Sequence, residues 1–195
     1  MNILHLDSSI LGTGSITRPL GQRLAQRLKD RLPGSRLSYR DLAADPIPHL
    51  TGEALVAQSG DDLSDVMAEF LAADVVVIGA PMYNFSISSQ LKAWIDRIAV
   101  AGKTFAYSPG GPVGLAGGKK VYIVSGRGTA FAGSPIEHWD FQEPYLRTVF
   151  AFIGITDVTF IRAEGVAQAR LRDEAISAAE AHIDALEIKR LLEAA

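Results

Sequence analysis

The chain has 195 residues, of which 48% are hydrophobic and 21% are charged, and its formal net charge is -3. These values fit one folded domain over residues 1–195 and exclude both a disordered chain and a strongly basic nucleic-acid-binding protein. The absence of cysteine excludes disulfides, thiolate metal sites, iron–sulfur clusters and a cysteine nucleophile, so any redox chemistry has to come from a bound cofactor.

The N-terminal sequence MNILHLDSS lacks the positive segment and the long apolar run of a secretory signal. Nowhere does an apolar run approach the roughly 20 residues that a membrane-spanning helix needs. We therefore expect a cytoplasmic protein with neither a membrane nor a nucleic acid as its partner.

The first half of the chain predicts two strands on either side of a helix. Residues 2–7 are largely apolar and end at a Ser/Gly/Thr segment, which is typical of a buried strand leading into a loop. Leucines at every fourth position predict a helix over residues 15–32. A second strand is predicted over 36–40, and a helix around 62–72 follows a loop that contains two prolines.

The second half continues this alternation. The run DVVVIG at 74–79 has no polar alternation, as expected for a parallel strand that is covered on both faces. A helix over 88–101 follows, and then a Gly/Pro-rich stretch at 107–118. The remaining predicted elements are strands at 120–125 and 156–162 and a helix at 168–193.

Alternating strands and helices predict an α/β fold with a parallel sheet and right-handed crossovers. In such a sheet, ligands bind outside the carboxyl ends of the strands, where the strand order reverses. The loops after the first, third and fourth strands are therefore the segments in which we look for a binding site.

The first of these loops, residues 8–20, has no Asp or Glu but carries several hydroxyl side chains and two glycines. It opens into a helix, whose free backbone N–H groups and dipole would face an anion, so a phosphate is the ligand that it predicts. Alternatively, Ser15 or Thr17 serves only as the N-cap of that helix. The loop by itself leaves both interpretations open.

Other nucleotide-binding patterns fail on spacing. Gly12 and Gly14 begin a G-x-G, but position 17 is threonine, and no G-x-x-x-x-G-K-S/T is present. Asp41, at the end of the second strand, could imitate the ribose-binding acid of a dinucleotide fold, but an exposed loop carboxylate is the favoured interpretation. A nucleotide monophosphate suits the first loop better.

The second loop, residues 80–86, offers two aromatic rings, a thioether and an amide that can hold a flat heteroaromatic ring, although such a cluster alone more often belongs to a core. In the third loop, residues 125–129, two glycines flank an arginine and permit either close backbone approach to a ligand or a plain surface turn. Because all three loops fall at one edge of the sheet, a ligand is favoured.

Metal binding and histidine catalysis are not expected. His5 lies in an apolar strand and is interpreted as a satisfied core or edge histidine. The other histidines, His49, His138 and His182, show no metal-ligand spacing, and no G-x-S-x-G segment supplies a nucleophile.

At these loops the sequence resembles the FMN-dependent NADH azoreductases of the flavodoxin-like fold, which are relatives of the NAD(P)H quinone dehydrogenases. The most specific stretch is PMYNF, at 81–85, followed by an S-x-Q-L-K helix. The resembling segments cover most of the chain: SSILGTGSITRPL at 8–20, RDLAADPIPHLTGE at 40–53, PMYNFSISSQLKAWIDRI at 81–98, TFAYSPGGPVGLAGGKK at 104–120 and FIGITDVTFIRAEG at 152–165.

The resemblance implies a flavodoxin-like fold with a five-stranded parallel sheet in the order 2-1-3-4-5, helices on both faces, and FMN as the cofactor. The implied FMN-binding residues are Ser9, Ser15, Ile16 and Thr17 for the phosphate, Met82, Tyr83, Asn84 and Phe85 for the ring system, and Gly126, Arg127, Gly128 and Thr129 for the other edge of the ring. Family members often read S-R-G-G at this last position, where this chain has G-R-G-T. This departure removes a hydroxyl and a glycine and leaves the backbone contacts.

The resemblance also implies the reaction. NADH or NADPH would pass a hydride to N5 of the flavin and leave, and a quinone or an aromatic azo compound would then receive two electrons, with no catalytic side chain. A homodimer is implied as well, with Tyr107, Phe131 and Phe152 as candidates to line the substrate pocket, although Phe152 is favoured as a core residue.

The alternative function is that of a flavodoxin-type electron carrier, which binds FMN without turning over NAD(P)H. The small acidic surplus of this chain speaks against it, because such carriers commonly use a strong field of one sign to reach their redox partners.

Overall fold

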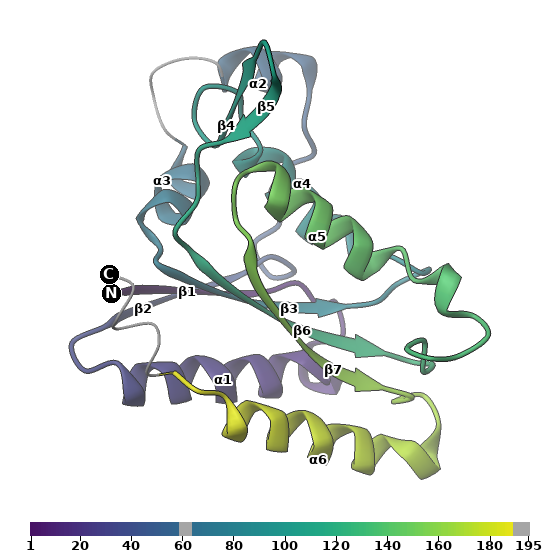
Figure 1. Ribbon diagram of the computed structural model, residues 1–195. Coiled ribbons are helices and arrows are strands. Elements are labelled where there is room, and N and C mark those ends of the chain that lie inside the picture. The colour runs from purple at the N-terminus through teal and green to yellow at the C-terminus, as the bar shows by residue number, and fades with distance from the viewer. Residues whose placement is uncertain (59–63, 189–195) are drawn as a thin grey trace.

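The computed structural model, which describes residues 1–58 and 64–188, is built on a parallel sheet of five strands (Figure 1). All four strand pairings are parallel, and the order is β2-β1-β3-β6-β7. This order is the predicted 2-1-3-4-5, because β6 and β7 are the fourth and fifth strands of the sheet along the chain. The strands are β1 (Asn2–Asp7), β2 (Arg36–Asp41), β3 (Val75–Pro81), β6 (Lys120–Arg127) and β7 (Asp157–Glu164).

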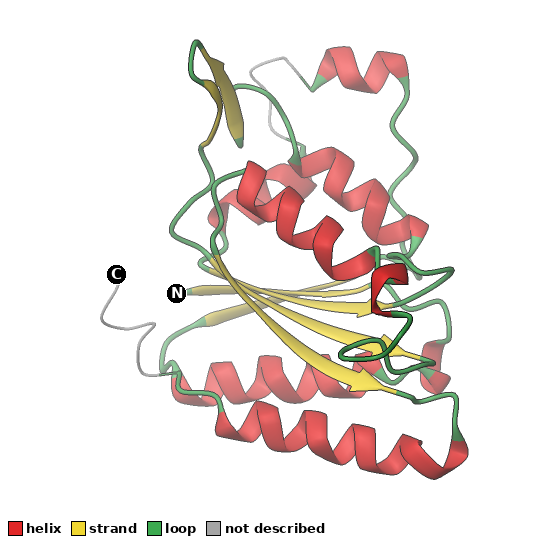
Figure 2. Ribbon diagram, turned by 45° about the vertical axis from the view of Figure 1, so that its right-hand side comes forward, coloured by secondary structure: helices red, strands yellow, loops and turns green. Residues whose placement is uncertain are grey.

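Helices cover both faces of this sheet, as predicted (Figure 2). On one face lie α1 (Thr17–Arg31) and α6 (Ala169–Ala185). On the other lie α3 (Asp65–Ala72), α4 (Ser89–Ile98) and α5 (Gln142–Phe152). The short helix α2 (Gly52–Ala57) and a hairpin of β4 (Phe105–Ser108) and β5 (Gly111–Gly114) lie on the side of α3, α4 and α5 that faces away from the sheet (Figure 1).

The central strand β3 shows why the sheet needs two helical layers. All seven of its residues are buried, and because side chains alternate along a strand they point to opposite faces. Val75 and Val77 belong to the core beneath α1 and α6, whereas Val76 and Ile78 belong to the core beneath α3, α4 and α5. The apolar run in the sequence therefore corresponds to a strand with a hydrophobic core on each side.

Several predictions made from periodicity need correction. Helices α2 and α5 were not predicted; α5 carries Pro144 in its first turn, where the missing N–H breaks no helical hydrogen bond. The Gly/Pro-rich stretch at 107–118 includes the turn of the β4–β5 hairpin and strand β5, which begins at Gly111 with φ 113°. The last helix ends at Ala185, not near 193, and residues 189–193 lie outside the described part of the chain, as do 62 and 63 at the start of another predicted helix.

Within residues 1–58 and 64–188, none of the helices combines the length and the apolar character that crossing a membrane requires.

Candidate functional site

Backbone hydrogen bonds at the carboxyl ends of β1, β3 and β6 bring the three predicted loops together. Ser8 directs both its N–H and its hydroxyl to the carbonyl of Gly79, at 3.2 and 2.7 Å. Met82 donates its N–H to the carbonyl of Gly126 at 2.9 Å. The first loop is thereby attached to the end of β3, and the second loop to the end of β6.

The first loop delivers hydroxyl groups to the start of α1. Ser9, Ser15 and Thr17 are buried, and Ile16 is half-buried. The hydroxyl of Ser15 accepts the N–H of Arg18 at 3.2 Å and lies 3.2 Å from the hydroxyl of Thr17. Ser15 therefore does cap the helix, while the other amides of the first turn have no helical partner and remain available to an anion.

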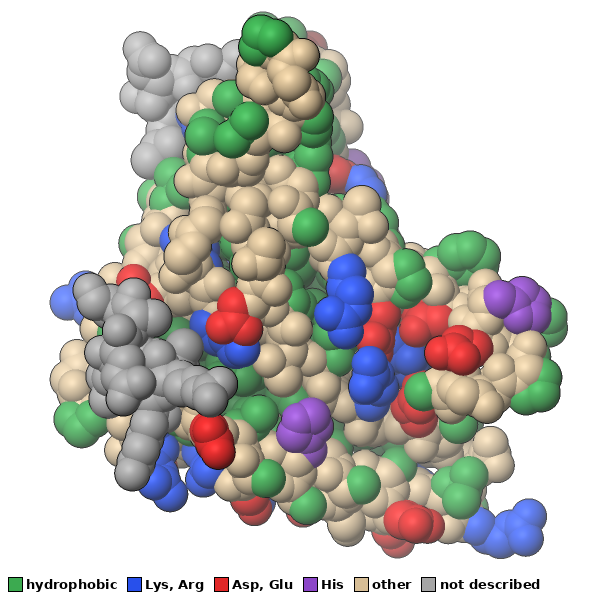
Figure 3. Space-filling view, viewed as in Figure 1, with side chains coloured by type: hydrophobic (Ala, Val, Ile, Leu, Met, Phe, Trp, Pro, Cys, Tyr) green, Lys and Arg blue, Asp and Glu red, His purple; other side chains and the backbone are tan. Residues whose placement is uncertain are grey.

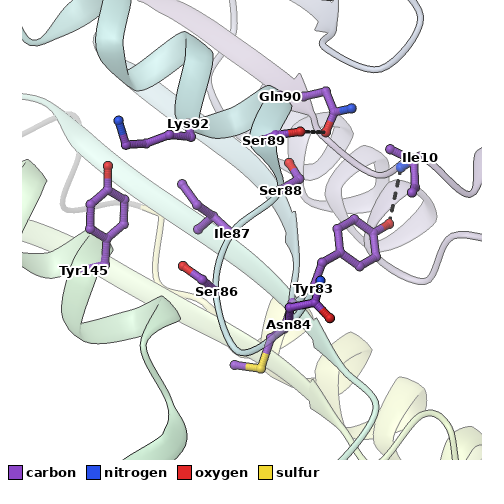
Figure 4. Close-up of a pocket in the computed structure, with 11 residues that line it drawn as sticks. Ile10, Tyr83, Asn84, Ser86, Ile87, Ser88, Ser89, Gln90, Lys92 and Tyr145 are labelled. Atoms are coloured by element: carbon purple, nitrogen blue, oxygen red, sulfur yellow. Dashed lines mark hydrogen bonds between the residues drawn. The ribbon is translucent and has the colours of Figure 1, made fainter. Parts of the chain in front are cut away.

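The second loop reaches back to the first through Tyr83. Its hydroxyl lies 3.3 Å from the hydroxyl of Ser9 and accepts the N–H of Ile10 at 3.3 Å (Figure 4). Asn84 and Phe85 have positive φ angles, 48° and 71°, which residues other than glycine rarely adopt. Reciprocal backbone hydrogen bonds between Tyr83 and Ser86 close this tight turn, and both of its central residues project outward.

A cavity of about 840 Å³ borders this turn, within the roughly 300–1,000 Å³ that small-molecule sites occupy. Figure 4 shows Tyr145 and Lys92 on one side of Ile87, with Ile10 and Gln90 on the other. Of the predicted binding residues, Met82, Tyr83 and Asn84 line the cavity. Its remaining lining residues are Ile10, Ser86, Ile87, Ser88, Ser89, Gln90, Lys92 and Tyr145.

The sequence analysis did not single out these remaining lining residues, Ile10, Ser86 to Gln90, Lys92 and Tyr145, as binding residues. The signal was present for most of them, because Ser86 to Lys92 belong to the segment that carries the family resemblance. Tyr145 had no signal, since it lies on the unpredicted helix α5.

The third loop approaches the first very closely at Gly126. A Cβ added there would lie 2.9 Å from Cγ2 of Thr17, so a larger residue would displace the start of α1. Gly128 and Thr129, which follow, are exposed. The backbone of this loop is therefore placed beside the hydroxyl groups of the first loop at Gly126.

The side chain of Arg127 points away into a cluster of acidic groups. It is 1% exposed and pairs with Asp140, Glu143 and Glu164 at 3.0, 2.8 and 2.9 Å. Arg162 binds the same Glu143, and Figure 3 shows acidic and basic side chains gathered between α5 and β7. Because the side chain of Arg127 is occupied by these ion pairs, only its backbone atoms remain as predicted ligand contacts.

The predicted substrate-pocket residues lie in different surroundings. The side chain of Tyr107, on the β4–β5 hairpin, is 77% exposed, whereas Phe131 is buried with its ring 5.9 Å from the Arg127 guanidinium. Phe152 is half-buried against the core, its ring centre 4.4 Å from that of Phe105. None of these three side chains lines the cavity beside Tyr83.

Two polar residues of the first and second strands differ from expectation. Asp41 is not an exposed loop carboxylate, because it is half-buried and accepts two hydrogen bonds from Arg18, at 2.6 and 2.8 Å. His5 is buried as predicted, but its Nε2 has no hydrogen-bond partner and lies 3.6 Å from a carboxylate oxygen of Asp7. Neither pairing can be read from the spacing of residues along the chain.

Comparison with known proteins connects this site with a chemistry. Residues 1–186 match the family described as having a flavodoxin-like fold. The chain is 52% identical over 192 residues to an FMN-dependent NADH:quinone oxidoreductase of Stenotrophomonas maltophilia (strain K279a), covering 96% of this chain and 97% of that protein. It is 56% identical over 170 residues to FMN-dependent NADH:quinone oxidoreductase 1 of Xanthomonas euvesicatoria pv. vesicatoria (strain 85-10), covering 86% of each.

A solved structure supports the fold independently. The crystal structure of an azoreductase from Bacillus anthracis str. Sterne superimposes with a TM-score of 0.84 at 23% sequence identity, and the match covers 98% of both chains. At this level of identity the similarity shows that the two chains share their fold.

Replacing Arg127 tests whether its buried ion pairs hold the third loop. Arg127→Met leaves three carboxylates without their shared cation, so the free energy of unfolding, measured in urea, is expected to fall by about 3–5 kcal/mol. Arg147→Met is the matched control, because Arg147 is 53% exposed and lies 3.7 Å from the same Glu143. Its loss should cost less than about 1 kcal/mol. Equal effects of the two substitutions would contradict a structural role of the buried cluster.

Proposed function

Because this chain belongs to the flavodoxin-like fold family, together with the FMN-dependent NADH:quinone oxidoreductases, we propose that it oxidises NADH and reduces quinones and aromatic azo compounds with bound FMN. The observation that carries this proposal is the cavity beside Met82, Tyr83 and Asn84, which the Tyr83 hydroxyl connects to Ser9 and Ile10 of the first loop.

The residues of the site fit FMN. Ser9, Ser15, Ile16 and Thr17 present hydroxyl and amide groups at a helix start, which is the environment that a phosphate prefers. Met82, Tyr83 and Asn84 offer a thioether, an aromatic ring and an amide beside the cavity, groups suited to the face and polar edge of a flavin, and Phe85 follows them in the same turn. Gly126 to Thr129 would meet the ring through backbone atoms, since Arg127 directs its side chain elsewhere.

Bound FMN supplies the redox step, in which NADH, a proton and a quinone become NAD⁺ and a hydroquinone. The chain itself has to orient flat molecules and stabilise negative charge through backbone N–H groups. We propose that NADH and the acceptor occupy the same cavity in turn, because both have to reach the same ring. This alternation is a ping-pong reaction, and no side chain needs to act as an acid, a base or a nucleophile.

Anaerobic absorption spectra test this proposal in two steps. Purified protein should show bands near about 370 and 450 nm that bleach when NADH is added alone, and a quinone or an azo dye added afterwards should restore them. Bleaching without any acceptor is what an alternating order requires. Bands that persist after NADH is added would instead indicate an electron carrier. If the protein shows no flavin bands even after FMN is supplied, the proposed function is excluded.

Asn84 allows its side chain to be tested separately from its backbone. Asn84→Gly keeps the positive φ angle accessible but removes the amide, whereas Asn84→Ala removes the amide and also strains the turn. If the amide binds the flavin, both variants should bind FMN more weakly, by about tenfold, or shift its reduction potential. Unchanged binding and potential in Asn84→Gly would contradict a role for the amide.

We propose that the enzyme is a homodimer in which the hairpin of one chain approaches the site of the other. Tyr107, Val113 and Leu115 on and beside the hairpin are 77%, 48% and 50% exposed, and Figure 3 shows hydrophobic side chains at its tip. Exposed apolar groups that gather in this way commonly mark a protein interface. In such a dimer, Tyr107 of one chain would line the substrate pocket together with Phe131 and Phe152.

Sedimentation equilibrium should give twice the 20.9 kDa mass of one chain. Val113→Asp should shift the protein toward the monomer, because it places a charge in the interface. In the dimer, Tyr107→Ser should raise KM for quinone by about tenfold without weakening FMN binding, since only the pocket loses a ring. A wild-type protein with the mass of one chain would contradict the dimer.

A further inference from the structure

Arg18 connects the two ends of the first loop. It lies in the first turn of α1, where the loop ends, and its Nη2 donates a hydrogen bond at 2.9 Å to the carbonyl of Ser9, where the loop begins. Ser9 and Ser15 are among the residues that would hold the FMN phosphate, and Ser15 also accepts the backbone N–H of Arg18. One residue therefore contacts both ends of the proposed phosphate-binding loop.

Asp41 fixes the position of this guanidinium. Its two carboxylate oxygens accept Nη1 and Nη2 of Arg18 at 2.6 and 2.8 Å, a fork geometry that only arginine can match. One of these oxygens also accepts the backbone N–H groups of Ala43 and Ala44, at 2.9 and 3.1 Å. The hydrogen bonds from Arg18 hold the pKa of Asp41 below its ordinary value, so the carboxylate stays ionised at neutral pH.

Asp7, which is buried, and Tyr39, which is exposed, also lie beside the pair. The hydroxyl of Tyr39 donates to Asp7 at 2.9 Å, and the same carboxylate oxygen lies 3.8 Å from Nη1 of Arg18. Desolvation raises the pKa of Tyr39 to about 12, so its hydroxyl remains a protonated donor at neutral pH. The guanidinium is thus surrounded by fixed acceptors on the side away from the loop.

Neither helix stability nor direct attraction of a phosphate accounts for Arg18 at this position. A cation in the first turn opposes the helix dipole. One guanidinium beside two carboxylates, those of Asp7 and Asp41, also leaves no net positive charge to attract an anion. What the arrangement supplies is a fixed distance between the start and the end of the loop.

We propose that Arg18 and Asp41 form a clasp that positions the loop over residues 8–17 for the FMN phosphate. The inference rests on the proposed function and assigns both side chains as positioning residues that act through the loop and do not touch the cofactor. A loop fixed in its binding conformation loses less conformational entropy when the ligand binds, so the phosphate binds more tightly.

The test compares FMN with riboflavin, which has the same ring system and no phosphate. Dissociation constants for both are measured by flavin fluorescence titration in Arg18→Lys, Asp41→Asn and the double variant Arg18→Met/Asp41→Asn. Each variant should bind FMN about tenfold more weakly, and riboflavin within about threefold of wild type, because only the phosphate contacts depend on the clasp. Thermal unfolding of the apoproteins shows whether each variant is folded. The double variant removes both charges of the pair, so neither position 18 nor position 41 carries an unpaired charge.

A second arginine–aspartate pair, which joins α1 to α6, provides the control. Arg23 of α1 binds Asp184 of α6 at 2.7 Å, with both side chains about half exposed. Arg23→Met and Asp184→Asn should leave the preference for FMN over riboflavin unchanged. A loss of preference in these controls as large as that in the clasp variants would overturn the proposal.

The sign of the Asp41→Asn effect separates the clasp from a direct role of Arg18. If Arg18 attracted the phosphate by its charge, removing the competing carboxylate would strengthen FMN binding, and Arg18→Lys would preserve it. Either result, or an unchanged preference in all clasp variants, would overturn the clasp while wild-type FMN binding still upheld the proposed function. A wild-type protein that binds no FMN would overturn both.

Discussion

The parallel pairing of β1, β3 and β6 is the constraint on which the site depends. Their register aligns Asp7, the last residue of β1, with Gly79, and Pro81, the last residue of β3, with Gly126 near the end of β6. The three loops therefore leave the same edge of the sheet. Hydrogen bonds from Ser8 to Gly79 and from Met82 to Gly126 then fix the loops to neighbouring strands.

Two arginines, Arg18 half-buried and Arg127 buried, stabilise the loops from either side of this edge. Arg18 is held by Asp41 near β2, and Arg127 by Asp140, Glu143 and Glu164 near β7. Both guanidinium groups turn toward protein carboxylates, so they fix backbone geometry where a flavoprotein needs it. Burying a charge such as that of Arg127 costs desolvation energy, which its three carboxylate partners offset.

The absence of a required catalytic side chain in this proposal agrees with the chemistry of an FMN-dependent oxidoreductase. The cofactor carries the electron transfer, and the protein provides a cavity, a strained turn at Asn84 and Phe85, and backbone amides near a helix start. Strain at such a turn persists only where the surrounding hydrogen bonds maintain it, here the pair between Tyr83 and Ser86 and the bond from Phe141 to Phe85. Phe141 follows Asp140, which pairs with Arg127, so its hydrogen bond also links the turn to the residues around the Arg127 cluster.

The sequence by itself predicted a parallel sheet of alternating strands and helices, because apolar periodicity records which faces of each element are buried. The strand order followed from the resemblance to a known family. The sequence also indicated Met82 to Asn84 as cavity residues. It missed α5, where Pro144 interrupts the periodic signal, and it misjudged Asp41 as exposed. Only the tertiary structure joined Asp41 to Arg18, 23 residues earlier, and turned Arg127 into its acidic cluster. Such pairings depend on which strands lie side by side and on the direction of each side chain, and a local pattern of residues carries neither.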